Sequence, residues 1–84
     1  MKKRDMKKKS ALLKAVIQIG KEGITNGVVE ELKRQLKEKK LVKVKFLRSA
    51  LEKTEREQLA RELQEKTNAI LIEIRGNTAV YQRK

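Results

Sequence analysis

Residues 15–46, AVIQIGKEGITNGVVEELKRQLKEKKLVKVKF, decide the fold of this 84-residue chain, because they hold three periodic segments joined by short turns. AVIQI (15–19) is rich in β-forming residues and too short for a helix, which predicts a strand. Apolar residues then recur at helical spacing from Thr25, a residue that can cap a helix, to about Lys40. LVKVKFL (41–47) alternates apolar and basic residues, which predicts a half-buried strand. The stretch therefore predicts a β-α-β unit.

A second helix and a β-hairpin are expected after this unit. Thr54 and Glu57 have the spacing of a capping box, which predicts a helix that continues to about Lys66. AILIEIR (69–75) and TAVYQ (78–82) alternate as strands do, and the Gly-Asn pair between them suits a type II′ turn. The inward-facing residues are expected to be Val28, Val29, Leu32, Leu36, Val42, Val44, Phe46, Leu59, Ala60, Leu63, Ile70, Ile72 and Ile74.

The predicted fold is an α/β two-layer sandwich: an N-terminal helix followed by β-α-β-α-β-β, with a four-stranded mixed sheet. Right-handed crossovers place both long helices on one face of that sheet. A short basic helix is expected from about Asp5 to Lys14, and residues 1–9 are set apart as a basic segment from a domain over residues 10–84. The opposite face of the sheet is expected to carry Val16, Leu71 and Tyr81, with the N-terminal helix able to cover it through Leu12 and Leu13.

The charge of the chain is strongly positive and unevenly distributed. The net charge is +12 and the isoelectric point is about 10.2. Residues 1–14 contribute +6 and residues 15–51 contribute +5, whereas residues 52–66 contribute −1. A surface that serves only solubility would mix both signs evenly. The alternative is a highly charged surface of the kind found in thermophilic proteins. The uneven distribution of positive charge along the chain instead favours a polyanionic partner such as nucleic acid.

Composition excludes several classes of function. The chain has no cysteine or histidine, so disulfides and a conventional zinc site are excluded, and nucleophile–base pairs for catalysis are lacking. The basic N-terminus is followed by no long apolar run, so we expect neither a signal peptide nor a membrane partner. We therefore expect a cytoplasmic location. The glycine segment matches neither the phosphate loop nor the dinucleotide fingerprint. We therefore expect no enzymatic activity, no cofactor and no small-molecule substrate.

The segment GKEG (20–23) is a Gly-x-x-Gly loop that contains a basic residue. Two nearby glycines let a sugar–phosphate backbone approach, and the following helix N-terminus favours an anion. The alternatives are a plain strand-to-helix turn and, for the strand lysines, protection of a sheet edge. We assign Gly27 instead to the start of the helix. The candidate RNA-binding residues are Gly20, Lys21, Glu22, Gly23, Lys14, Lys43, Lys45 and Arg48.

These segments together resemble the CRM domain, in particular its stand-alone YhbY-like members. The resemblance covers roughly residues 10–84: strand, Gly-Lys-x-Gly, Ile-Thr, helix and LVKVK strand, then AILIEIRGNTAVYQRK. It implies a fold similar to the C-terminal domain of bacterial translation initiation factor three, with the last strand inserted beside the second. It also implies RNA binding through the glycine loop. Relatives associate with precursors of the large ribosomal subunit, and plant multi-domain members act in intron splicing.

Our hypothesis is a non-catalytic protein, favoured as a monomer, that docks on structured RNA, either ribosomal RNA or precursors of the large subunit. One rival is a chromatin-type protein similar to Alba that binds DNA and RNA. A second rival is a protein-interaction adaptor that uses the acidic helix 52–66.

Overall fold

The computed structural model describes residues 13–84. The helix expected from Asp5 to Lys14 and the contact expected of Leu12 lie outside these residues, apart from the last two positions of that helix, which are not helical. The described elements are β1 (Ala15–Ile19), α2 (Asn26–Glu38), β2 (Leu41–Phe46), α3 (Arg48–Leu51), α4 (Arg56–Thr67), β3 (Ile70–Arg75) and β4 (Thr78–Gln82).

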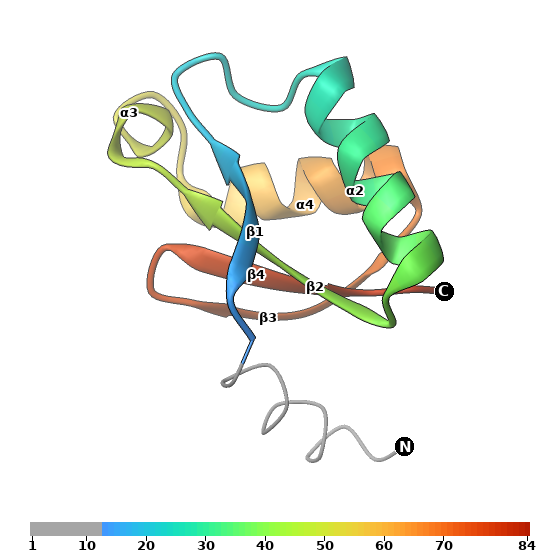
Figure 1. Cartoon of the computed structure of the whole chain (residues 1–84). Helices are drawn as coiled ribbons and strands as arrows, with labels where there is room; N and C mark the ends of the chain where they lie inside the picture. Colours follow the sequence, from blue (N-terminus) through green and yellow to red (C-terminus); the bar gives the residue numbers. More distant parts are fainter. Residues whose placement is uncertain (1–12) are drawn as a thin grey trace.

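The four strands form one mixed sheet in the order β1-β2-β4-β3. β1 is parallel to β2, and β4 is antiparallel to both of its neighbours, β2 and β3. Figure 1 shows α2 and α4 on one face of this sheet, with α3 near the ends of β1 and β2. The two-layer α/β sandwich is therefore confirmed, including the insertion of the last strand beside the second.

The helix α2 forms as its sequence predicts. The Thr25 hydroxyl accepts a hydrogen bond from the Val28 backbone N–H at 3.2 Å, so it satisfies one of the donors that a helix start leaves unpaired. The apolar stripe faces the sheet: Val29, Leu32 and Leu36 are buried. Val28 is partly buried and packs against the same core.

The segment between β2 and α4 differs from the prediction. The sequence predicted no helix here, but residues 48–51 form α3. The Thr54 N–H still donates to the Ala50 carbonyl at 3.2 Å. Thr54 therefore belongs to the turn that ends this short helix, so its prediction as a cap was wrong. The helix α4 begins one residue after Glu55, which makes no side-chain capping bond.

A β-bulge in β3 moves Leu71 to the helix-covered face. The register shifts between Leu71 and Glu73, so Leu71 lies opposite Tyr81 and both point toward the helices. The assignment of Leu71 to the opposite face was wrong because strict alternation does not anticipate a bulge. The same assignment for Tyr81 in β4 was also wrong, because its hydroxyl bonds to the Ala60 carbonyl of α4. Ile70 is 38% exposed and does not face the core as expected. Val16, at 45% exposed, is not part of the core, in agreement with its assignment to the opposite face.

Candidate nucleic-acid interface

The Gly-x-x-Gly segment is a tight turn that follows β1. The Gly23 N–H donates to the Gly20 carbonyl at 2.9 Å, which closes the turn around its two central residues. Those residues are Lys21 and Glu22, and both are exposed. The turn therefore presents one cation and one carboxylate at its tip.

The two glycines of this turn differ in what requires them. Gly23 has a φ of +71°, a backbone conformation that costs free energy for residues other than glycine. A Cβ added at Gly23 would meet no atom within 4 Å. A Cβ on Gly20 would lie 3.6 Å from Ser49 Oγ and 3.7 Å from Leu47 Cδ1, which are ordinary contacts. Gly23 is therefore the position with open space for an approaching ligand, whereas Gly20 packs beside α3.

The N-terminus of α2 lies directly after this turn, and its first turn carries no acidic residue. The partial positive charge of a helix N-terminus favours an anion, and no first-turn carboxylate opposes it here. The turn and the helix start are therefore electrostatically suited to a phosphate group, with Glu22 as the acidic residue closest in sequence.

The structure places Gly27 inside the first turn of α2, as the sequence predicted. We expect Gly27→Ala to raise the free energy of unfolding by about 0.5–1 kcal/mol, because glycine costs more conformational entropy than alanine in a helix. The new Cβ would lie 3.6 Å from the Thr25 hydroxyl, an ordinary contact, so the cap should survive. Urea denaturation measures the change, and a loss of stability would contradict this role for Gly27.

The short helix α3 stands beside the glycine turn. The Leu47 N–H donates to the Ile19 carbonyl at 2.8 Å, so the start of α3 is tied to the end of β1. This bond and the approach of Ser49 to Gly20 bring the exposed Arg48 next to the turn. Arg48 was predicted from the sequence, whereas Ser49 was not. The helical spacing of Leu47, Ala50 and Leu51 was the signal that could have indicated α3.

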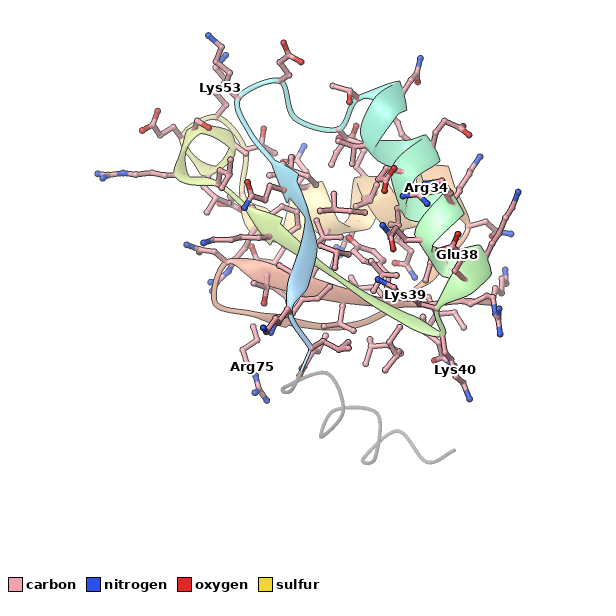
Figure 2. The ribbon with its side chains drawn as sticks, viewed as in Figure 1. Arg34, Glu38, Lys39, Lys40, Lys53 and Arg75 are labelled. Carbon is pink, nitrogen blue, oxygen red and sulfur yellow. The ribbon has the colours of Figure 1, made fainter. Side chains whose placement is uncertain are left out.

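A further cation, Lys53, follows α3 and was also missed by the sequence analysis. It is exposed, and its backbone N–H donates to the Ala50 carbonyl at 3.3 Å. Figure 2 shows its side chain extending outward at the end of the molecule where the β1–α2 connection lies.

Lys43 and Lys45 lie on the sheet face opposite the helices. Their neighbours Val42, Val44 and Phe46 are buried, which confirms the predicted alternation of β2. Lys45 is exposed, whereas Lys43 is half-buried and its Nζ donates to the Leu13 carbonyl at 3.3 Å. Lys45 pairs in register with Gln18, two residues before the glycine turn, so it is the nearer of the two lysines to that turn.

Lys14 lies at the far end of β1 from the glycine turn. The five residues of β1 separate them, which corresponds to about 17 Å of strand. Lys14 instead shares a groove of about 280 Å³ with Lys39 and Lys43, over a floor that includes Val16 and Leu41. The predicted residues therefore lie in a row along β1 and β2 and do not form one compact site.

Residues 13–84 contain neither a candidate metal site nor a candidate membrane-spanning helix. No group of three or more acidic, histidine or cysteine side chains in this part of the chain could hold a metal ion. No helix within the same residues is long and apolar enough to span a membrane.

Comparisons with known proteins identify relatives of this chain. The solution structure of a hypothetical protein from Staphylococcus aureus has the same fold: the TM-score is 0.76 at 24% identity, over 98% of this chain and 83% of the other. A protein of Methanocaldococcus jannaschii described as a probable RNA-binding protein is 35% identical over 81 residues. That match covers 96% of this chain, which spans 60% of the length of the relative. The family model of the CRS1/YhbY (CRM) domain matches residues 1–83, and the chain therefore belongs to the CRM domain family.

Proposed function

We propose that this protein binds RNA without catalysing a reaction. Its family and its similarity to an archaeal protein described as a probable RNA-binding protein support this function. The net charge of +12 suits a polyanion, because phosphate neutralisation supplies most of the sequence-independent affinity for nucleic acid.

One observation carries the proposal: the glycine turn pairs an open backbone position with an exposed cation. The space next to Gly23 lets a sugar–phosphate chain approach the backbone, and Lys21 at the tip neutralises a phosphate. Arg48 extends the contact on one side, and Lys45 extends it along the sheet. Phe46 and Tyr81, the two aromatic residues of the chain, are both fully buried, so binding relies on backbone charge and shape instead of base stacking.

The RNA that we propose is structured ribosomal RNA or a precursor of the large subunit, bound by a monomer in the cytoplasm. This finer assignment rests on the resemblance of the GKEGIT turn and the flanking strands to stand-alone members of the family. Crosslinking in cells followed by sequencing of the bound RNA tests it directly. Enrichment of ribosomal sequences is the expected result, and enrichment of messenger or transfer RNA would overturn the ribosomal assignment.

The role of the glycine turn is tested by Gly23→Asn. Asparagine tolerates a positive φ better than most residues, so the turn should keep its shape while a side chain fills the open space. We expect the affinity for structured RNA at physiological salt to fall about tenfold, which corresponds to the loss of about one hydrogen bond to the RNA backbone. The matched control is Gly76→Asn, which places asparagine at the other positive-φ glycine of the described chain, between β3 and β4. Unchanged affinity in Gly23→Asn would contradict the proposal.

The charge of the turn is tested separately by Lys21→Gln. Loss of one phosphate contact should reduce the slope of log affinity against log salt by about 0.7–0.9. Titrations at several salt concentrations measure this slope, and duplex DNA as a competitor distinguishes RNA binding from an Alba-like function. An unchanged slope would remove Lys21 from the interface.

A further inference from the structure

A second group of cations gathers at the end of α2 that lies away from the glycine turn. Three segments meet there: the last turns of α2, the connection into β2, and the residues that follow β4. The Arg83 N–H donates to the Lys40 carbonyl at 3.0 Å, and Arg83 Nη1 donates to the Lys37 carbonyl at 3.2 Å. Figure 1 shows the chain end beside the α2–β2 connection, and Figure 2 shows Lys39 and Lys40 at that connection. We call this group the distal basic surface; its members are Lys33, Lys37, Lys39, Lys40, Arg83 and Lys84, and all are exposed.

Local contacts occupy three of these six cations: Lys33, Arg83 and Lys84. The C-terminus of a helix carries partial negative charge and attracts cations. The Arg83 side chain provides such a cation at the C-terminus of α2, where it donates to the Lys37 carbonyl. Lys84 Nζ donates to the Asn68 side chain, at the C-cap of α4, at 3.2 Å. Among residues 13–84, the only ion pair that the six cations form joins Lys33 and Glu30 at 3.8 Å. The side chains of Lys37, Lys39 and Lys40 form no hydrogen bond or ion pair within the described residues, so their charge is available to an external anion.

The shape of this surface suits an extended chain. Four of its cations, Lys33, Lys37, Arg83 and Lys84, border a shallow groove of about 250 Å³. Its floor includes Leu36 and Ala69, which can contact the less polar sugar edge while the cations meet phosphates. A row of cations above a partly apolar floor fits a sugar–phosphate backbone better than an isolated anion.

We infer that the distal basic surface is a second binding site for RNA backbone, separate from the glycine turn. This inference rests on the proposed function. The 13 residues of α2 separate the two surfaces by about 20 Å, which corresponds to about six stacked nucleotides. One protein can then hold two RNA segments, or two points of one structured RNA, at a fixed distance.

The test uses the full chain with Lys37→Gln, Lys40→Gln and Lys84→Gln combined, since none of these side chains donates to a backbone carbonyl of the described residues. A control that removes the same charge elsewhere combines Arg61→Gln, Lys66→Gln and Arg75→Gln, because these side chains also donate to no backbone carbonyl of the described residues. The probes are oligoadenylates of about four and about twelve nucleotides, whose bases stack along the strand. Only the longer exceeds the distance of about six stacked nucleotides between the surfaces. Affinity and salt slope are measured for each.

We expect the distal variant to lose about tenfold in affinity for the longer RNA. Its slope of log affinity against log salt should fall by about two units. The shorter RNA, which reaches one surface at a time, should show a much smaller loss, and the control should change little with either probe. Equal losses in the distal variant and the control would overturn the inference, and so would equal losses with both probes.

The same titrations separate this inference from the function on which it rests. If Lys21→Gln weakens binding while the distal variant behaves like the control, the proposed function stands and the second site is wrong. If the distal variant weakens binding and Lys21→Gln does not, the distal surface stands and the role of the glycine turn fails. Absence of RNA binding by the unmodified chain overturns both.

Discussion

Replacement of Phe46 by alanine is expected to lower the free energy of unfolding by about 3–5 kcal/mol, the usual cost of truncating a buried phenylalanine. Phe46 is fully buried between the sheet and the helices. It also ends β2, where its N–H donates to the Asn77 carbonyl at 2.7 Å and its register partner is Ile19 of β1. Small domains are stable by roughly 5–15 kcal/mol, so this loss is a large share of the total.

Denaturation in urea measures this change, with Phe46→Leu as the control that keeps most of the volume and should cost less than about 1.5 kcal/mol. Because Phe46 joins the strands that precede the glycine turn and α3, the alanine variant should also lose RNA affinity through partial unfolding. Addition of a stabilising osmolyte should restore that affinity. A free energy change below about 1 kcal/mol would show that this end of the core repacks around the cavity.

Periodicity predicted the elements of the fold, and breaks in periodicity caused the errors. The strand β2 and the helix α2 lie close to their expected bounds, because their apolar residues repeat without interruption; β1 also matches its bounds, although its register shifts between Ala15 and Ile17. The bulge in β3 changes the phase of alternation after Leu71. Ile70 is therefore exposed and Leu71 faces the core, contrary to the prediction, whereas Ile74 packs against the core as predicted. Backbone pairing with β4 decides where such a bulge falls, and that pairing is not visible in a local pattern.

The candidate site was predictable where it is local in sequence. The glycine turn is four consecutive residues, and the structure shows Lys21 and Glu22 at its tip. The contact of Gly20 with Ser49 joins residues far apart in sequence, and it depends on α3, which the sequence analysis did not expect. The distal basic surface was missed for the same reason. The hydrogen bond that brings Arg83 to the end of α2 joins it to Lys37, 46 residues earlier in the sequence.

Tyr81 should make the protein lose stability above about pH 10. Its ring is fully buried and its hydroxyl donates to the Ala60 carbonyl at 2.8 Å, and burial raises the pKa of this phenol above its ordinary value. In the unfolded chain the phenol ionises near pH 10, whereas in the folded protein it stays protonated. Unfolding therefore releases a proton, and the free energy of unfolding should fall by up to about 1.4 kcal/mol per pH unit above that point. The stabilisation is complete below pH 10 and is lost as pH rises.

Tyr81→Phe isolates this effect from the titration of the many lysines, which both proteins share. At neutral pH the variant should be less stable by about 1 kcal/mol because it lacks the hydrogen bond to Ala60. It also lacks the ionisable group, so the two stability curves should cross near pH 11, where the loss in the unmodified protein equals that deficit. Tyr81 is the only tyrosine of the chain, so ultraviolet absorbance of the phenolate reports its ionisation directly. Parallel curves that never cross would mean that the phenol ionises in the folded state, and that the contact between Tyr81 and α4 opens without unfolding.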